Sequence, residues 1–243
     1  MNSAEWFKDW FNSPYYHLLY NNRNENEAKF FIDNLCSHLN LQPNANVWDL
    51  ACGKGRHAVC LNNKGYKVVG TDLSKNSIKE ASQYSNATLD FYVHDMREPF
   101  RINYFDAVFN LFTSIGYFEN FNDNFSVFKN IANSLKPNGV FVIDFFNSKK
   151  VASTLKTDYI EQRGDITFKI KKQIANNAIS KRIEFNANNH QYYFEESVSL
   201  LKKEDFENFA KKAGLKIESI FGNYSLEPFN ENTSERLIII FKK

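Results

Sequence analysis

Cysteine is scarce in this sequence: 3 of 243 residues, and no two are spaced as C-x-x-C. The three, Cys36, Cys52 and Cys60, cannot all pair with one another, so a disulfide framework is not expected. Their spacing also does not fit the ligand patterns of structural zinc sites. We therefore expect a reducing compartment and a protein that holds no structural zinc.

Long apolar runs are lacking as well. The first ten residues include acidic side chains and no stretch of signal-peptide length. Nowhere does an apolar segment of the sequence reach the ~20 residues that a membrane span requires. These features predict a cytoplasmic protein with no membrane partner.

Neither sign of charge is in excess. The formal net charge is +2, and the lysines are spread along the chain instead of forming a basic tract. No nucleic-acid-binding module is recognisable, so nucleic acid is not expected as a partner. A hydrophobic content of 43% over 243 residues is enough for one core. It favours one catalytic domain with an insertion over two full domains.

The segment 47–58 carries the strongest functional signal. A short apolar strand leads into a turn with Gly53 and Gly55, and a helix follows. Glycines there leave no Cβ to obstruct a ligand, and the unpaired N–H groups of the helix favour a bound negative charge. The spacing of Gly53, Gly55 and Ala58 also satisfies the G-x-G-x-x-A pattern of dinucleotide-binding folds. The turn alone therefore predicts a charged cofactor without deciding its class.

Acidic residues recur on or just after three successive predicted strands, the first of which precedes the glycine turn. Asp49 lies on the first strand, Asp72 ends a second strand over 67–72, and Asp95 follows a third over 89–93. This order resembles the class I S-adenosylmethionine-dependent methyltransferases over residues 45–145. The segment 135–143 is similar to that family's helix–turn–fifth-strand connection.

The resemblance implies a fold and a cofactor site. The fold is α/β: a Rossmann-like, seven-stranded, mostly parallel sheet with helices on both faces. The cofactor is S-adenosyl-L-methionine, the product S-adenosyl-L-homocysteine, and no metal is required. The cofactor contacts implied are Tyr16, Tyr20, Asp49, Ala51, Gly53, Gly55, Asp72, Leu73, Asp95, Met96, Asn110 and Leu111.

Roles for the acids follow from the same resemblance. Asp72 is expected on the ribose hydroxyls, and Asp95 with Met96 on the adenine. Asp49 would be costly to bury on an apolar strand without a partner, and the ammonium group of the cofactor supplies one. A dinucleotide enzyme has little use for that carboxylate, which leaves a nicotinamide oxidoreductase as a remote alternative.

Four regions are predicted along the chain. They are an N-terminal helical cap (1–44), the cofactor-binding core (45–147), an antiparallel β insertion (148–202) and the C-terminal part of the core sheet (203–243). The insertion is indicated by apolar residues that alternate with a period of two and by asparagine pairs at its turns. The resemblance implies that the last two strands form an antiparallel hairpin at one edge of the sheet.

The place of the insertion suggests its role. Ligands of open α/β sheets bind beyond the carboxyl ends of the strands, where the connection after the fifth strand begins. We expect a cover over the methyl acceptor; packing on a second subunit in a homodimer is the alternative. Acceptor contacts are expected from Tyr117, Asn147, Arg163 and Tyr192. No catalytic residue is assigned; the candidates are Tyr117 and His190.

The acceptor class is narrowed by exclusion. Residues 110–117 lack the Asn/Asp-Pro-Pro-aromatic loop of nucleobase amino methyltransferases and offer no cysteine for cytosine chemistry. Asp144 is the one obvious extra acid at this rim, so a catalytic metal is not expected. We predict direct in-line transfer to nitrogen or oxygen of a small molecule, with positioning and proton removal as the protein's tasks. The alternatives are a protein or RNA acceptor and a regulatory protein that binds the cofactor without turnover.

Overall fold

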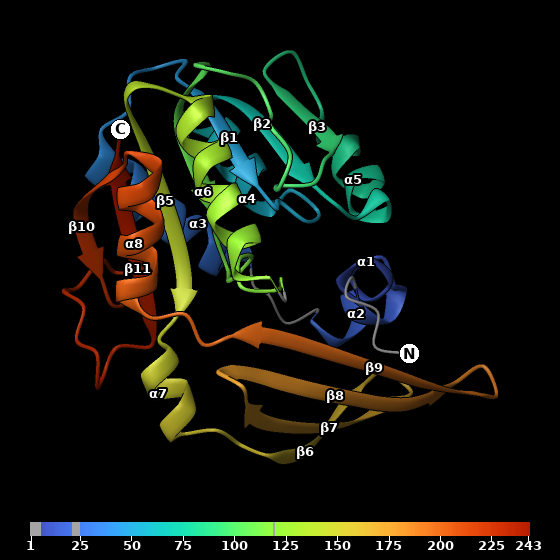
Figure 1. The fold of residues 1–243 in the computed structure, drawn as a ribbon. Coiled ribbons are helices and arrows are strands. Elements are labelled where there is room, and N and C mark those ends of the chain that lie inside the picture. The colour runs from blue at the N-terminus through green and yellow to red at the C-terminus, as the bar shows by residue number, and fades with distance from the viewer. Residues whose placement is uncertain (1–5, 21–24, 119) are drawn as a thin grey trace.

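The computed structural model describes residues 6–20, 25–118 and 120–243, which form two sheets (Figure 1). The larger has seven strands in the order β10-β11-β5-β4-β1-β2-β3, and the smaller has four in the order β6-β7-β8-β9. The strands of the larger sheet are β1 (Asn46–Leu50), β2 (Lys67–Asp72), β3 (Leu89–Val93), β4 (Phe105–Asn110), β5 (Leu135–Phe146), β10 (Lys216–Phe221) and β11 (Arg236–Lys242).

The remaining elements are eight helices, one 3₁₀ turn and the strands of the smaller sheet, counted over the described ranges. The helices are α1 (Trp6–Phe11), α2 (Pro14–Leu19), α3 (Glu25–Leu39), α4 (Arg56–Asn63), α5 (Lys75–Ala81), α6 (Phe121–Ser134), α7 (Ser148–Ser153) and α8 (Lys203–Ala213), with η1 at Ser82–Tyr84. The smaller sheet consists of β6 (Asp158–Arg163), β7 (Ile166–Ala175), β8 (Ala178–Ala187) and β9 (His190–Ser199). Within the described ranges, no helix combines the length and the apolar character needed to cross a membrane.

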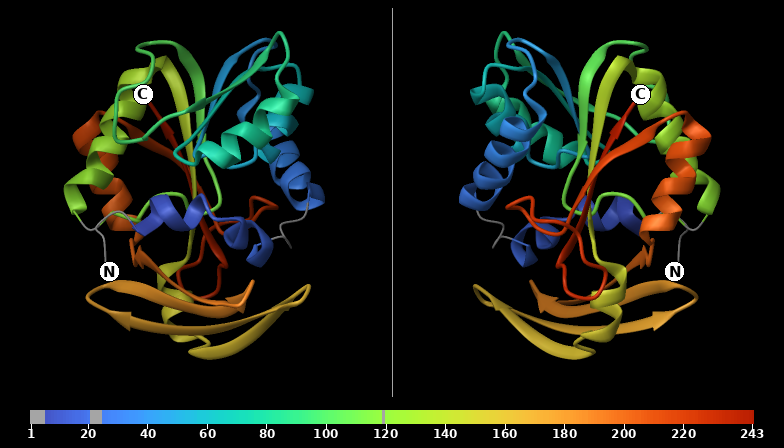
Figure 2. Two further views of the ribbon diagram at one scale, coloured as in Figure 1. Left: turned by 90° about the vertical axis from the view of Figure 1, so that its right-hand side faces the viewer. Right: turned by 90° about the vertical axis from the view of Figure 1, so that its left-hand side faces the viewer.

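The larger sheet has the predicted topology. Strands β1 to β5 pair in parallel, whereas β11 is antiparallel to both β5 and β10. Helices α6 and α8 cover one face of the sheet, and α3, α4 and α5 cover the other (Figure 2). Their apolar side chains are buried in the two core clusters. The predicted Rossmann-like fold and its edge hairpin are therefore confirmed.

The turn expected within the segment 135–143 lies inside β5. Leu135 pairs with Phe105 and Val140 with Ala107, so five steps along β5 lie opposite two steps along β4. Asn138 adopts a left-handed φ of 64° within this irregularity. The chain turns as expected. Pairing with β4 is present both before and after the turn, so β5 already begins at Leu135.

The first two helices belong with the small sheet. Trp10 and Leu19 are buried against Phe168, Ile170 and their neighbours on β7 and β8. Helix α3, by contrast, packs on α4 and the core sheet. We call α1, α2 and strands β6–β9 together the cap unit; it lies beyond the carboxyl ends of the parallel strands (Figure 1).

Candidate functional site

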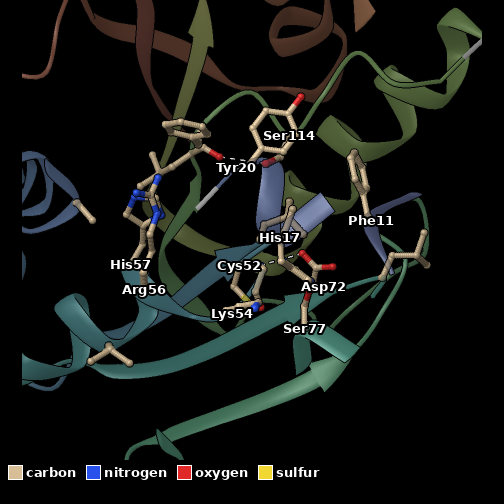
Figure 3. Close-up of a pocket in the computed structure, with 18 of the residues that line it drawn as sticks. Phe11, His17, Tyr20, Cys52, Lys54, Arg56, His57, Asp72, Ser77 and Ser114 are labelled. Carbon is tan, nitrogen blue, oxygen red and sulfur yellow. Dashed lines mark hydrogen bonds between the residues drawn. The ribbon is translucent and has the colours of Figure 1, made fainter. Parts of the chain in front are cut away.

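A cavity of about 680 Å³ lies between the carboxyl ends of the parallel strands and the cap unit. Figure 3 shows Asp72, Ser77 and His17 on one side of this hollow and Arg56 with His57 on another. The predicted cofactor residues that line the cavity are Tyr16, Tyr20, Ala51, Gly53, Asp72, Leu73, Asp95, Met96 and Leu111. The structure thus brings most of that set together around one space.

Asp72 fixes the turn that follows β1. One oxygen of its carboxylate accepts the N–H of Gly53 at 2.9 Å, and the other accepts the N–H of Ser74 at 2.8 Å. Burial raises the pKa of this carboxyl, although the backbone donors act in the opposite direction. The left-handed φ of Gly53, 56°, suits a residue without a side chain. One acid therefore holds both the glycine turn and the start of α5 at the cavity wall.

Gly55, which was predicted as a cofactor contact, has a packing reason to be glycine. This residue does not line the cavity. A Cβ added at Gly55 would lie 2.7 Å from Cε1 of Phe91. The φ of 83° and the packing of β3 behind the turn therefore account for this glycine, and Gly53 is the one that borders the cavity.

Replacement of Gly55 by alanine is expected to destabilise the fold and to leave the affinity of the folded protein for S-adenosylhomocysteine nearly unchanged. The left-handed backbone costs about 1–2 kcal/mol, and the overlap with Phe91 adds about 1–3 kcal/mol. Gly65→Ala is the control, because Gly65 has a similar φ of 89° and no atom within 4 Å of an added Cβ. Urea unfolding compares the two; equal losses would contradict the packing explanation.

Asp49 and Asn110 are not lining residues of the cavity, although their sequence neighbours Leu50 and Leu111 are. Both are buried, and Nδ2 of Asn110 donates to the carbonyl of Leu50 at 3.0 Å. Oδ2 of Asp49 and Oδ1 of Asn110 have no hydrogen-bond partner among the residues that the structure describes. Burial raises the pKa of Asp49 from 3.8 to about 7. The Ala58 N–H and the charge of Arg56 act against this rise. One buried carboxylate oxygen and one buried amide oxygen thus lack donors, which suits a cationic or hydrogen-bonding ligand.

Asp95 and Met96 border the cavity next to His94. The carboxylate of Asp95 accepts a hydrogen bond from Nη2 of Arg97 at 2.6 Å. Nη1 of Arg97 also lies 3.5 Å from Oδ2 of Asp123. Arg97 therefore fixes the orientation of this carboxylate at the end of β3. A ligand amino group at Asp95 would share the carboxylate with Arg97.

Tyr20 links the cavity to the insertion. Its hydroxyl donates to Glu196 at 2.7 Å and accepts from Nζ of Lys181 at 2.5 Å. Trp10 donates to the same Glu196 carboxylate at 2.5 Å. The ring of Tyr20 thus borders the cavity while its polar end is held by strands β8 and β9.

Three predicted acceptor contacts, Asn147, Arg163 and Tyr192, and the catalytic candidate His190 are not brought to the cavity. Asn147 caps α7 and donates to the carbonyls of Glu231 and Ser234, and Nε of Arg163 donates to the carbonyl of Leu19. Tyr192 stacks on Phe185 at 5.0 Å, and His190 is exposed. Among the described residues, strands β6–β9 contribute none to the cavity lining. They pack against α1 and α2, which do contribute lining residues.

Tyr117 does border the cavity, and its hydroxyl donates to the carbonyl of Thr113 at 2.6 Å. Sequence reasoning missed other lining residues, namely Phe7, Phe11, His17, Phe112 and Ser114. The aromatic spacing of 6–11 predicts only a packed helix, and no glycine marks the bend at Phe112. No three His, Cys, Asp or Glu side chains gather as a possible metal site within the described residues.

Comparison with known proteins identifies the relatives of this chain. A family model described as "Methyltransferase domain" matches residues 48–143. A putative methyltransferase of Bacillus subtilis, YqeM, is 34% identical over 126 residues, which cover 50% of this chain and 51% of that protein. The chain thus spans about half the length of this curated relative.

Two further relatives are similar over more of their length. A Streptomyces venezuelae dTDP-3-amino-3,4,6-trideoxy-alpha-D-glucopyranose N,N-dimethyltransferase is 24% identical over 191 residues, covering 74% of this chain and 79% of that one. The crystal structure of an S-adenosylmethionine-dependent methyltransferase from Clostridium acetobutylicum superposes with a TM-score of 0.78 at 24% identity, covering 94% and 95%. The latter likeness extends the shared fold to the cap unit.

Proposed function

We propose, from the premise that residues 48–143 are a methyltransferase domain of the class I S-adenosylmethionine-dependent family, that this protein transfers a methyl group to a nitrogen or oxygen of a small molecule. The observation that carries the proposal is the glycine turn held by Asp72 at the wall of a cavity of about 680 Å³. S-Adenosylmethionine would supply an activated methyl group on a sulfonium. The protein's own tasks are then to bind, to orient and to exclude water.

The residues present fit this cofactor. Asp49 and Asn110 are each next in sequence to a lining residue, Leu50 and Leu111, and their unpartnered oxygens would accept from an ammonium group that reached past the lining. Asp72 offers a carboxylate at the cavity wall for a ribose diol. Asp95 and Met96 border the same cavity and would hold the adenine. Gly53 leaves room beside the turn, since a Cβ there would meet nothing within 4 Å.

The cavity walls favour a small acceptor. Phe11, Tyr16 and Tyr20 from α1 and α2 lie opposite the core, and Phe112 and Tyr117 follow β4. Aromatic faces exclude water and attract cationic groups, which suits an amine. His17 and His57 also border the cavity and offer imidazoles that can accept a proton. The name of the Streptomyces relative supports an amino nitrogen as the methyl acceptor.

The test is an acceptor screen. Purified protein is incubated with S-adenosylmethionine and panels of amino sugars, simple amines and phenols, and S-adenosylhomocysteine and methylated product are followed by mass spectrometry. We expect turnover with an amine and none when the acceptor is omitted. Tight NAD binding together with no affinity for S-adenosylhomocysteine would contradict the proposal.

Asp49 gives the cofactor site a pH dependence. Its pKa near 7 means that the carboxyl is half protonated at neutral pH, and an ammonium ligand favours the ionised form. Affinity for S-adenosylhomocysteine should therefore rise as pH increases through 7, with proton release on binding below it. The stability of the free protein should depend on pH in the opposite direction to the affinity. Because the pKa of Asp49 is raised on folding, its contribution to the free energy of unfolding falls as pH rises from 3.8 to about 7.

Calorimetry at pH 6, ~1 unit below that pKa, in two buffers of different ionisation enthalpy measures the released protons. Asp49→Asn should bind without proton release and show a flatter pH profile. Proton-neutral binding by the unmodified protein would contradict the role given to Asp49.

A further inference from the structure

The loop that follows β4 has an unusual backbone. Phe112 and Thr113 are consecutive, neither is glycine, and both are left-handed, with φ of 65° and 60°. Such values are rare for residues with a side chain, and most of all for a β-branched one such as Thr113. They persist only where the surroundings impose them.

Asp144 on β5 imposes this backbone. Its Oδ2 accepts the N–H of Phe112 at 2.9 Å, and its carbonyl accepts the N–H of Thr113 at 2.9 Å. The side chain is 1% exposed and does not line the cavity. One residue therefore receives both N–H groups of the left-handed pair.

Arg236 on β11 completes the arrangement. Its Nε donates to Oδ1 of Asp144 at 2.7 Å, and its Nη2 donates to Oγ1 of Thr113 at 3.1 Å. The hydroxyl of Tyr224 also approaches Oδ2 of Asp144, at 3.3 Å. The guanidinium thus joins the acid on β5 to the side chain of the bent loop. A planar, multidentate donor suits this task better than a single ammonium group.

The same loop supplies part of the cavity wall. Phe112, Ser114 and Tyr117 line it, and Cζ of Arg56 lies 4.8 Å from the centre of the Phe112 ring. The hydroxyl of Tyr117 is anchored on the carbonyl of Thr113. A change of backbone at Thr113 therefore moves both the Phe112 ring and the anchor of Tyr117.

We propose that Asp144 and Arg236 are positioning residues for methyl transfer, which hold the left-handed Phe112–Thr113 pair so that the loop shapes the acceptor side of the cavity. This inference rests on the proposed function. It also gives Asp144, the acid considered above as a metal ligand, a different task. Its carboxylate is used by the Phe112 N–H and by Arg236.

Asp144→Asn should lower methyl transfer about 10- to 100-fold, the range for a misplaced wall near reacting groups. Affinity for S-adenosylhomocysteine, measured by calorimetry, should stay within about threefold. Hydrogen exchange of the Phe112 and Thr113 amides, followed by NMR, should become faster. Arg236→Lys should show the same changes to a smaller degree. Asp106→Asn is the matched control: it weakens the ion pair between Asp106 on β4 and Lys136 on β5, away from the loop, and should leave all three readouts unchanged.

A second pair of variants covers the case in which Asp144→Asn does not fold. Thr113→Val keeps the Asp144–Arg236 pair and removes only the Oγ1 acceptor, so it should fold and still lose turnover. Thr113→Asn, added to Asp144→Asn or to Arg236→Lys, should restore part of the turnover, because asparagine tolerates a left-handed φ. Because asparagine at this φ also raises stability in general, the rescue counts only where urea unfolding shows that the single and double variants are fully folded under the assay conditions.

The outcomes separate the two claims. The proposed function is overturned if the unmodified protein neither binds S-adenosylhomocysteine nor turns over any acceptor. In that case, amide exchange still tests whether Asp144 and Arg236 hold the loop. Normal turnover together with unchanged exchange in folded Asp144→Asn, or in Thr113→Val where only that variant folds, overturns the positioning role. Reduced turnover with faster exchange and rescue by Thr113→Asn supports it.

Discussion

Asp72→Ala is expected to weaken S-adenosylhomocysteine binding about 100-fold, ~2.8 kcal/mol. The substitution removes the acceptor for the N–H groups of Gly53 and Ser74, so the turn and the start of α5 lose their common anchor. It also removes the carboxylate expected on the ribose. Leaving buried hydrogen-bonding groups unpaired costs about 1–3 kcal/mol, which places the loss in this range.

Isothermal calorimetry on the folded variant measures the change. Asp90→Ala is the control, because Asp90 is an exposed acid on the neighbouring strand β3 and does not line the cavity. An Asp72→Ala protein that folds and binds S-adenosylhomocysteine with unchanged affinity would remove Asp72 from the cofactor site.

Trp10→Ala is expected to lower methyl transfer at least about 100-fold while affinity for S-adenosylhomocysteine falls less than about tenfold. Trp10 is 0% exposed, and its ring centre lies 4.4 Å from that of Phe194 on β9. Truncating such a side chain costs about 3–5 kcal/mol of packing. The helices α1 and α2 would then lose their support on the small sheet, and with it the wall that includes Tyr16 and Tyr20.

The control for this substitution lies on the same sheet. Tyr193→Ala removes an aromatic side chain from β9 that is 48% exposed, and turnover should not change. Limited proteolysis of both variants reports whether α1 and α2 have come loose. Full turnover by Trp10→Ala with the helices demonstrably released would show that the acceptor does not need the cap unit.

The strand tips that border the cavity were predictable because their sequence signals are local. An acid on an apolar strand, a glycine turn and acids at the next two strand ends predict the strand tips, and Asp72 and Asp95 lie where that pattern places them. The antiparallel strands of the insertion were also legible, since alternation with a period of two reports one buried face.

What escaped prediction depends on contacts between distant segments. The reason for Gly55 is the ring of Phe91, some 36 residues further along the chain, which the G-x-G spacing cannot reveal. The bend at Phe112 and Thr113 has no glycine or asparagine to announce it and comes from Asp144 and Arg236. Alternation in the insertion did not reveal that α1 and α2 would cover its inner face, which is why Arg163 and Tyr192 were expected at the cavity.

The crystal structure of the protein with S-adenosylhomocysteine at saturating concentration tests the central claim most directly. We predict one molecule in the cavity, with its ribose hydroxyls on the carboxylate of Asp72 and its adenine between Leu111 and the Asp95–Met96 segment. The sulfur should face the aromatic wall formed by Tyr16 and Tyr117. Density for the ligand outside this cavity, or a cavity that stays empty while calorimetry shows binding, would contradict the account.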